Sequence, residues 1–383
     1  MAMQPTEARN LFPLTRDYIF FNHAGISPMS DRTRAALHSL IEDMTLRPTP
    51  IDLVEEPADR LRRSLARLLH VPAETVAITR NTAHGLSLLA QGLDWQQGDN
   101  LIIGKGDYRE NVHPWRALAE RGVELREAPA VDGRITPEAV FDLVDERTRL
   151  ISLSHVQHAN GFRVDLTAIG RECDRRGIVF AVDAVQSVGA LQLDLSQLPV
   201  DFLAAGACKW LMGPIGAGFC YCRPELLKRL GTPLAGVRST THPKDFFSAL
   251  FDVSDEARRI EESSVSPLDI VAFGVAIDLL LEVGPAVVEK CVLGLSRRLA
   301  EGLDREGLEV VGPWPREDRE SSGIVSFRRP GSTPTEIVRE LRCAGVVGRI
   351  YPDSVRLSPH FYNTQAEIDR VVQILTPVRI SAP

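Results

Sequence analysis

The sequence predicts an α/β protein with a mainly parallel sheet covered by helices on both faces. Short β-branched runs alternate with helical stretches from residue 76 to residue 222, and this alternation is typical of parallel sheets. The chain has 383 residues, of which 44% are hydrophobic and 25% are charged. These values are ordinary for a globular protein with a sizeable core, and the length predicts about two to three domains.

The elements follow in order along the chain. Apolar residues recur at helical spacing over residues 31–44 and 57–69. Seven strands are then expected at VAIT (76–79), LIIG (101–104), VELREA (123–128), LISLS (150–154), IVFAVD (178–183), FLAAG (202–206) and GFCYC (218–222). Apolar stripes at three- and four-residue spacing predict helices between the strands, over 85–93, 114–121, 137–144 and 166–176.

The strand–helix alternation breaks near Leu230. We therefore expect a large domain over residues 16–284 and a smaller α+β domain over residues 285–383. Residues 1–15 are polar with two prolines, which predicts a loose arm that packs on the small domain. Beyond the break, helices are expected at 268–283, 287–306, 335–344 and 364–375, and the short runs GIVSFRRP and VRLSPH lie between the last three.

Charge and composition exclude several classes of partner. The charges sum to 44 − 51 = −7, so we expect no nucleic-acid partner. The longest apolar stretch, residues 270–281, is too short for a membrane span and contains Asp278, so no membrane partner is expected. Glu7 and Arg9 stand where a signal peptide would be apolar, and the six scattered cysteines are typical of reduced thiols. These features predict a cytoplasmic protein.

The loop after the first strand of the sheet is a candidate anion site. Asn81, Thr82 and Ala83 follow VAIT and open a helix. Free backbone N–H groups and the helix dipole attract anions at such a position. The same residues are also ordinary helix caps, so the local pattern leaves both interpretations open.

Two strand ends carry the groups that a pyridoxal phosphate site needs. Asp183 ends a hydrophobic strand, where open α/β sheets bind ligands, although a turn or cap role is equally compatible. Lys209 follows another strand among small residues, where burial would lower the pKa of its amine and make it nucleophilic. In such a site the lysine forms the Schiff base, and the aspartate pairs with the protonated pyridine nitrogen so that the ring becomes an electron sink.

Four motifs in this order resemble the class V aminotransferase family, whose members are pyridoxal 5'-phosphate (PLP) enzymes of fold type I. The motifs are SHVQHANG, VDAVQSVGALQLD, the segment around Lys209 and VRLSPHFYNTQAEID. Within the family, the chain looks most like isopenicillin N epimerase-like and cysteine desulfurase-like proteins, from about Phe20 to about Leu375. The resemblance implies the PLP-dependent transferase fold, a small-molecule amino-acid substrate and a homodimer.

The resemblance also implies roles for single residues. Lys209, Asp183 and Tyr108 are the expected catalytic residues, with Tyr108 stacked on the cofactor ring. The remaining expected contacts are Asn81, Thr82 and Ala83 at the phosphate, Gln186 beside the phenolic oxygen, either His158 or Asn160 near that oxygen, Ser264 at the phosphate of a neighbouring subunit, and His23 and Arg356 at the substrate. A guanidinium such as that of Arg356 suits bidentate binding of a carboxylate.

Departures from the family pattern bear on the reaction. Desulfurases often carry Ser-x-His-Lys, whereas this chain has Gly-Ala-Cys-Lys, and Cys208 either packs inertly or tunes Lys209. No cysteine lies between Gly345 and Arg356, where desulfurases carry their sulfur acceptor. The nearest one, Cys343, is expected to be packed in the preceding helix. We therefore expect lyase or aminotransferase chemistry without persulfide formation.

Other readings stay open at this point. The alternative reactions are an isopenicillin N epimerase-like epimerisation and a desulfurase-like C–S lyase reaction without a loop cysteine. The residues also allow a relative without turnover, or a binding module with a coincidental lysine. The pairs Cys220 with Cys222 and His155 with His158 lack further metal ligands, and a GxGxxG motif for a dinucleotide is absent. No metal is therefore expected.

Overall fold

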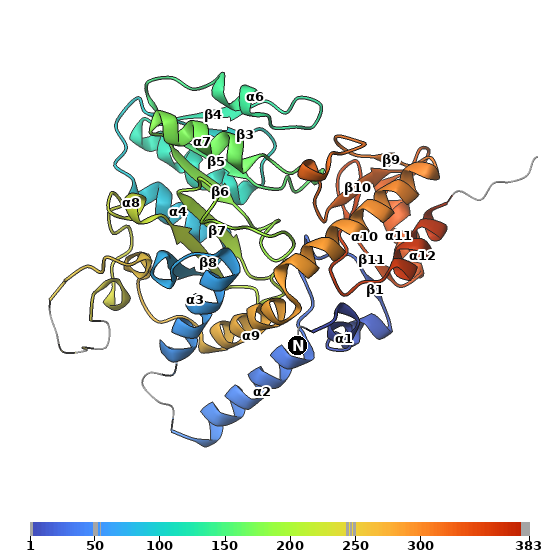
Figure 1. The fold of residues 1–383 in the computed structure, drawn as a ribbon, viewed down its shortest axis with the longest axis horizontal. Helices are drawn as coiled ribbons and strands as arrows, with labels where there is room; N and C mark the ends of the chain where they lie inside the picture. The colour runs from blue at the N-terminus through green and yellow to red at the C-terminus, as the bar shows by residue number, and fades with distance from the viewer. Residues whose placement is uncertain are drawn as a thin grey trace, which may run out of the picture.

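The computed structural model describes residues 3–48, 53, 55–242, 245, 247 and 250–376. Figure 1 shows a larger lobe around a central sheet and a smaller lobe that contains the orange and red C-terminal elements. The long helix α2 (Asp31–Leu46) lies along the lower edge of the view, next to the large lobe. The predicted α/β fold class is confirmed.

The central sheet has seven strands, and each lies within two residues of its predicted position. In space they run in the order β2-β8-β7-β6-β5-β3-β4. Only β8 is antiparallel to its neighbours, β2 and β7, while the other pairs are parallel. Their bounds are β2 (Val76–Thr79), β3 (Asn100–Gly104), β4 (Glu124–Ala128), β5 (Thr148–Ser154), β6 (Val179–Asp183), β7 (Phe202–Gly206) and β8 (Gly218–Cys222).

Helices bury both faces of this sheet, which explains the near-continuous apolar runs of its strands. Leu150 and Phe202 belong to one hydrophobic core, and their neighbours Ile151 and Leu203 belong to the other. The helices of the large lobe are α3 (Glu55–Leu69), α4 (Thr82–Gly92), α5 (His113–Arg116), α6 (Pro137–Phe141), α7 (Leu166–Arg176), α8 (Pro224–Leu227) and α9 (Pro267–Val283).

Two predicted helices are shorter than their apolar patterns indicate. The pattern over 114–121 splits into α5 and a 3-10 turn, Ala117–Arg121, which ends at Gly122 with φ 75°. Helix α6 ends three residues before the predicted position, because Asp142 and the residues after it form turns instead. In both cases only a few residues separate the helix from the next strand.

The smaller lobe is α+β. Its four-stranded antiparallel sheet has the order β12-β13-β10-β9, and β11 (Val346–Val347) pairs in parallel with β1 (Ile19–Phe20). The predicted domain boundary at residues 284 and 285 falls between α9 and α10 and stays a prediction. The other elements are α10 (Pro285–Arg305), β9 (Glu309–Val310), β10 (Val325–Arg328), α11 (Pro334–Cys343), β12 (Arg349–Ile350), β13 (Val355–Leu357) and α12 (Gln365–Leu375).

Among the described residues, no single helix has both the length and the hydropathy to cross a membrane. Helices α9 and α10 meet those criteria only when they are taken together across a bend of 83°.

The N-terminal arm is more ordered than its polar sequence indicates. It forms the short helix α1 (Pro5–Arg9), and the Arg9 guanidinium donates to both carboxylate oxygens of Glu367 at 3.1 and 2.8 Å. The buried ring of Phe12 stacks on Tyr362 with 4.0 Å between the ring centres. The arm is therefore not loose, because it packs against α12 and the segment before it.

Two buried histidines connect the C-terminal part of the chain to the segment before α2 and to Trp210 after β7. The His23 ring lies 2.9 Å from the Ser358 carbonyl oxygen through Nδ1 and 2.6 Å from the Tyr362 hydroxyl through Nε2. The His360 Nε2 lies 2.9 Å from the Trp210 carbonyl oxygen. Burial lowers the pKa of His23 well below its usual range, and burial lowers the pKa of His360 to about 4.

These lowered pKa values predict a loss of stability in acid. Below about pH 6.5 the unfolded chain binds protons that the folded histidines do not bind, so the free energy of unfolding falls as the pH drops. For His360 alone, with a folded pKa of about 4, the loss between pH 7.5 and pH 5 is roughly 2 kcal/mol.

Denaturant titrations at pH 7.5 and pH 5 measure this difference in the free energy of unfolding. The difference should shrink in His360→Gln and persist in His113→Gln, a change at an exposed histidine of α5. An equal difference in both variants would contradict the assignment.

Candidate active site

The carboxyl ends of four strands bring most of the predicted site residues to one edge of the sheet. Asp183 ends β6, and Lys209 follows β7 by three residues. Asn81 and Thr82 follow β2, and His158 follows β5. Parallel strands place their carboxyl ends at the same edge, so the topology explains why residues far apart in sequence meet here.

Asp183 is a buried carboxylate whose charge is unfavourable without a cation. Its side chain is 2% exposed, and Oδ1 accepts from the Val185 N–H at 3.0 Å. Burial raises the pKa of Asp183 to about 7, although the Val185 N–H and the charge of Lys209 oppose the shift. A cation placed against this carboxylate would favour its ionised form.

Lys209 is held in place by its backbone. The Ser27 hydroxyl donates to the Lys209 carbonyl oxygen at 2.6 Å, and the Ser27 N–H donates to the Cys208 carbonyl oxygen at 2.8 Å. Burial lowers the pKa of the Lys209 amine, while the charges of Asp183 and Glu110 oppose the shift. Within the described part of the chain, no carboxylate lies within ion-pair distance of this amine. Lys209 is thus a buried amine without a direct counter-ion.

The start of α4 can act as both a cap and an anion site. The Asn81 side chain accepts from the His84 N–H at 2.8 Å, which caps the helix. The Thr82 hydroxyl oxygen accepts from the Gly206 N–H at 3.0 Å, which ties the loop to the end of β7. The backbone N–H groups of Thr82 and Ala83 remain available for an anion.

A second group of side chains near Lys209 contains Tyr108 and His158. The Lys209 Nζ lies 5.4 Å from the centre of the Tyr108 ring, and the Tyr108 ring meets the His158 ring edge-on at 5.1 Å. Tyr108 is 42% exposed, so its ring is available to a ligand. Burial lowers the pKa of His158 to about 4, with the charges of Arg356 and Lys209 adding to the effect.

Arg356 brings a cation from the small lobe into this group. It lies on β13 and is 3% exposed. Its Nη1 donates to the His158 carbonyl oxygen at 2.8 Å and to the Tyr351 hydroxyl at 2.8 Å. No described carboxylate lies within ion-pair distance of Arg356, and burial lowers the pKa of its guanidinium. A buried guanidinium without an anion is unfavourable, so this position suits the binding of a carboxylate.

Three predicted residues have their polar atoms occupied elsewhere. Asn160 donates to the Gly133 carbonyl oxygen at 2.8 Å and accepts from the Phe162 N–H at 2.9 Å, so it shapes a turn and His158 faces the site instead. Both ring nitrogens of His23 are engaged, which disfavours the predicted contact of His23 with substrate. Gln186 lies on the expected rim, but its amide bridges the Ala24 carbonyl oxygen and the Trp210 indole.

Ser264 is exposed and makes no hydrogen bond with these groups of described residues. It lies two residues after Glu262, which forms an ion pair with Arg80 beside Asn81. Its predicted contact with a neighbouring subunit stays a prediction.

Two residues of the candidate site, Tyr351 and Asp107, were not predicted from the sequence. The Tyr351 hydroxyl lies 3.0 Å from the His158 Nδ1 and bridges it to Arg356. Asp107 is buried beside the site and accepts from the Gln157 amide at 2.7 Å and from the Asn111 amide at 2.9 Å. Asp107 directly precedes Tyr108 and could have been noticed as an acid after a buried strand. No local signal marks Tyr351, because its role depends on contact between the lobes.

Comparison with known proteins decides the family. The sequence profile described as "Aminotransferase class-V" matches residues 52–371. The chain belongs to the class V aminotransferase family. The predicted family is thereby confirmed, and with it the PLP cofactor on which the family depends.

Several relatives of this family member are similar over nearly the whole chain. A probable cysteine desulfurase of Methanothermobacter thermautotrophicus is 25% identical and covers 98% of each sequence. The isopenicillin N epimerase of Streptomyces clavuligerus is 30% identical and covers 89% of this chain and 88% of its own. The apo cysteine desulfurase of Thermococcus onnurineus has the same fold, with a TM-score of 0.87, 24% identity and 98% coverage of each chain.

The residues of this class V aminotransferase family member fit PLP. Asp183 is a buried carboxylate that a protonated ring nitrogen would neutralise, Lys209 is a buried amine without a counter-ion, and the start of α4 has free N–H groups for a phosphate. In the described part of the chain, no group of three or more His, Cys, Asp or Glu side chains could hold a metal ion.

Proposed function

We propose that the chain catalyses lyase or aminotransferase chemistry on an α-amino acid, with PLP attached to Lys209 and the substrate carboxylate held by Arg356. The observation that carries the proposal is a pair of buried basic side chains, Lys209 and Arg356, near the buried Asp183. Neither has a carboxylate within ion-pair distance among the residues that the structure describes. PLP, when bound, supplies an electron sink for charge at the α-carbon.

The residues of the chain then have distinct tasks. Asp183 keeps the ring nitrogen protonated, and Tyr108 offers an aromatic face to the ring. Arg356 binds the substrate carboxylate and thereby fixes the position of the α-carbon. Burial lowers the pKa of the Lys209 amine, which makes it a better general base near neutral pH. Once the substrate amine has taken its place on the cofactor, the released Lys209 amine would remove the α-proton.

A screen of amino acids tests this function. Purified holoenzyme is mixed with single amino acids while its cofactor absorbance, keto-acid release and sulfide release are followed. Incorporation of solvent deuterium into recovered substrate of inverted configuration would favour the epimerase alternative, which the 30% identity to an isopenicillin N epimerase supports. No spectral change with any amino acid would contradict the proposal.

The position of Cys343 supports a reaction without persulfide formation. Cys343 is the last residue of α11 and is exposed, so the expectation that it is packed is wrong. The connection between β12 and β13 is only residues 351–354, closed by the Tyr351 N–H donating to the Ser354 carbonyl oxygen at 2.9 Å. This short hairpin contains no cysteine and is too tight to carry a long mobile loop.

We therefore expect Cys343→Ala to retain full activity in the amino-acid screen. Mass spectrometry after incubation with cysteine should detect no persulfide on Cys343, because the thiol lies on the exposed end of a helix. Cys291→Ala, which alters a half-buried thiol on α10, serves as the matched control. A persulfide on Cys343 whose loss abolishes turnover would refute the assignment.

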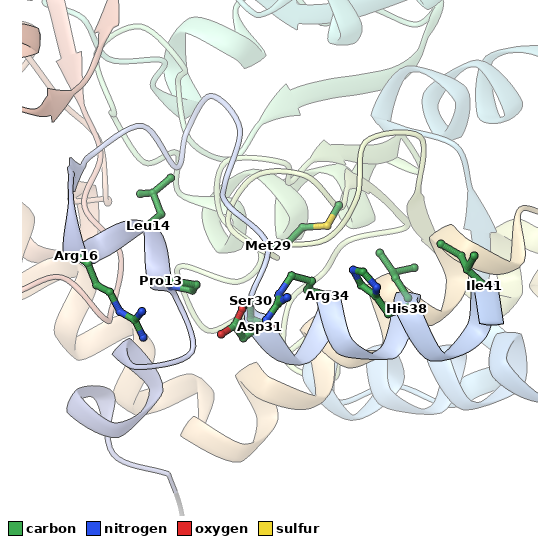
Figure 2. A pocket seen from close by; sticks show the side chains of 10 residues that line it. Pro13, Leu14, Arg16, Met29, Ser30, Asp31, Arg34, His38 and Ile41 are labelled. Atoms are coloured by element: carbon green, nitrogen blue, oxygen red, sulfur yellow. Dashed lines mark hydrogen bonds and ion pairs between the residues drawn. The ribbon is translucent and has the colours of Figure 1, made fainter. Parts of the chain in front are cut away.

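We also propose a cytosolic homodimer. Only Thr33 is buried on α2, while Met29 and Ile41 beside it are 43% and 51% exposed. Figure 2 shows Arg34, His38 and Ile41 in a row along the same side of this helix. Together with Leu14 and Leu37 they line a groove of about 730 Å³. An apolar groove of this kind favours association with a second copy.

The cytosolic part of the proposal is supported by the six free thiols, which are typical of proteins in a reducing compartment.

Light scattering of the holoenzyme should report a dimer. Ile41→Glu should shift the protein towards the monomer, because it places a charge in the apolar groove. Ser39→Glu, on the other side of α2, should leave the dimer intact. A native monomer with full cofactor occupancy would rule out a homodimer whose subunits share the active site.

A further inference from the structure

Arg356 has a second arginine directly opposite it. Strand β12 runs antiparallel to β13, and Arg349 is the register partner of Arg356. Side chains of directly opposed residues lie on the same face of an antiparallel pair, with Cβ atoms about 4.5–5.5 Å apart. Arg349 therefore shares the face from which Arg356 reaches His158.

Neither arginine of this pair has an anionic partner among the described residues. Like charges directly opposite each other destabilise a sheet. Burial is the main cause of the lowered pKa of Arg356; Tyr351 opposes the shift, and the charge of Arg349 adds to it. Three other arginines of the small lobe do form ion pairs: Arg328 with Glu309 and Asp353, Arg329 with Glu340, and Arg298 with Asp369.

We propose that Arg349 and Arg356 bind two acidic groups of one substrate, so that the substrate is an amino acid with a second acid in its side chain. Arg356 is buried near Lys209 and takes the α-carboxylate. Arg349 is exposed at the rim and takes the side-chain acid. An anion bound between them removes the repulsion that the strand pair otherwise carries. The amino-acid part of this assignment rests on the proposed function, whereas the binding of a dianion does not.

Calorimetric titration of the holoenzyme with glutarate and with its monoamide tests the pair. The two ligands differ only in the second charge, and neither has an amino group that could react. We expect native protein to bind glutarate about tenfold more tightly than the monoamide at low ionic strength, with a smaller preference in 0.5 M salt, roughly as screening predicts.

Two variants separate the contributions. Arg349→Met should lower the affinity for glutarate to that of the monoamide and leave the monoamide unchanged. Arg342→Met removes an exposed arginine from neighbouring α11 and should preserve the tenfold preference. Arg356→Met should weaken the binding of both ligands.

Equal native affinities for the two ligands would overturn the proposal, as would a preference that survives Arg349→Met. Equal weakening of both ligands in Arg349→Met would also overturn it, because both arginines would then grip one carboxylate. A failed amino-acid screen with an intact glutarate preference would refute the proposed reaction and leave the two-arginine site standing.

Discussion

Replacing Lys209 with alanine will abolish covalent attachment of PLP and lower turnover by at least about 10³-fold, since both the attachment point and the general base are lost. The protein should still fold, because the contacts that fix this turn involve the backbone carbonyls of Cys208 and Lys209 rather than the lysine side chain.

Borohydride reduction followed by peptide mapping measures the attachment directly. The chain has few candidates to distinguish, which are Lys105, Lys209, Lys228, Lys244 and Lys290. Lys228→Ala, a change at the exposed residue that follows α8, should retain the label and the activity. A label on any lysine other than Lys209 would show that the site has been assigned to the wrong strand end.

Asp183→Asn is expected to lower turnover by about 10²- to 10⁴-fold while part of the cofactor is retained. The substitution preserves size and keeps an oxygen for the Val185 N–H, so the loop after β6 should stay in place. It removes the negative charge that would hold a proton on the ring nitrogen, and the electron sink weakens accordingly. Steady-state kinetics and cofactor content, measured on the same preparation, check both parts.

Asp174→Asn provides the matched control for this change. Asp174 is an exposed acid on α7 that forms an ion pair with Arg223. The topology of the sheet places both residues away from the residues of the site. Its loss should leave turnover within about twofold of the native value, as surface ion pairs contribute little. Near-native turnover in Asp183→Asn itself would mean that the ring nitrogen does not depend on this carboxylate.

The sheet could be predicted closely from sequence because its strands are buried on both faces. Runs such as VFAVD and FLAAG are apolar up to their last residues, Asp183 and Gly206, and every residue in them is buried. The same property places Asp183 and Lys209 at strand ends, and these two positions could be found from local pattern alone. The antiparallel direction of β8 could not be predicted, since an apolar run such as GFCYC does not indicate the direction of its strand.

The contacts between the two lobes could not be predicted from local sequence patterns. His158 and Asn160 lie in one short loop and are equally polar, and only the packing against Gly133 and Tyr351 separates their roles. The resemblance implies a substrate contact for His23, yet its Nε2 lies at hydrogen-bond distance from the Tyr362 hydroxyl. Arg349 carries no signal of its own, because its meaning depends on the register that sets it opposite Arg356.

The first thirty residues connect distant parts of the sequence, and this has a consequence for the order in which the protein matures during synthesis. Ser27 secures the Lys209 turn, His23 requires Tyr362, and Arg9 requires Glu367. Because Arg9 and His23 are translated long before Glu367 and Tyr362, this segment completes its contacts only after α12 has been translated. Until then Phe12 and Phe21, both fully buried in the finished protein, have no native partners to cover them. We therefore expect nascent chains to expose these apolar side chains, and to be prone to aggregation, until α12 has emerged.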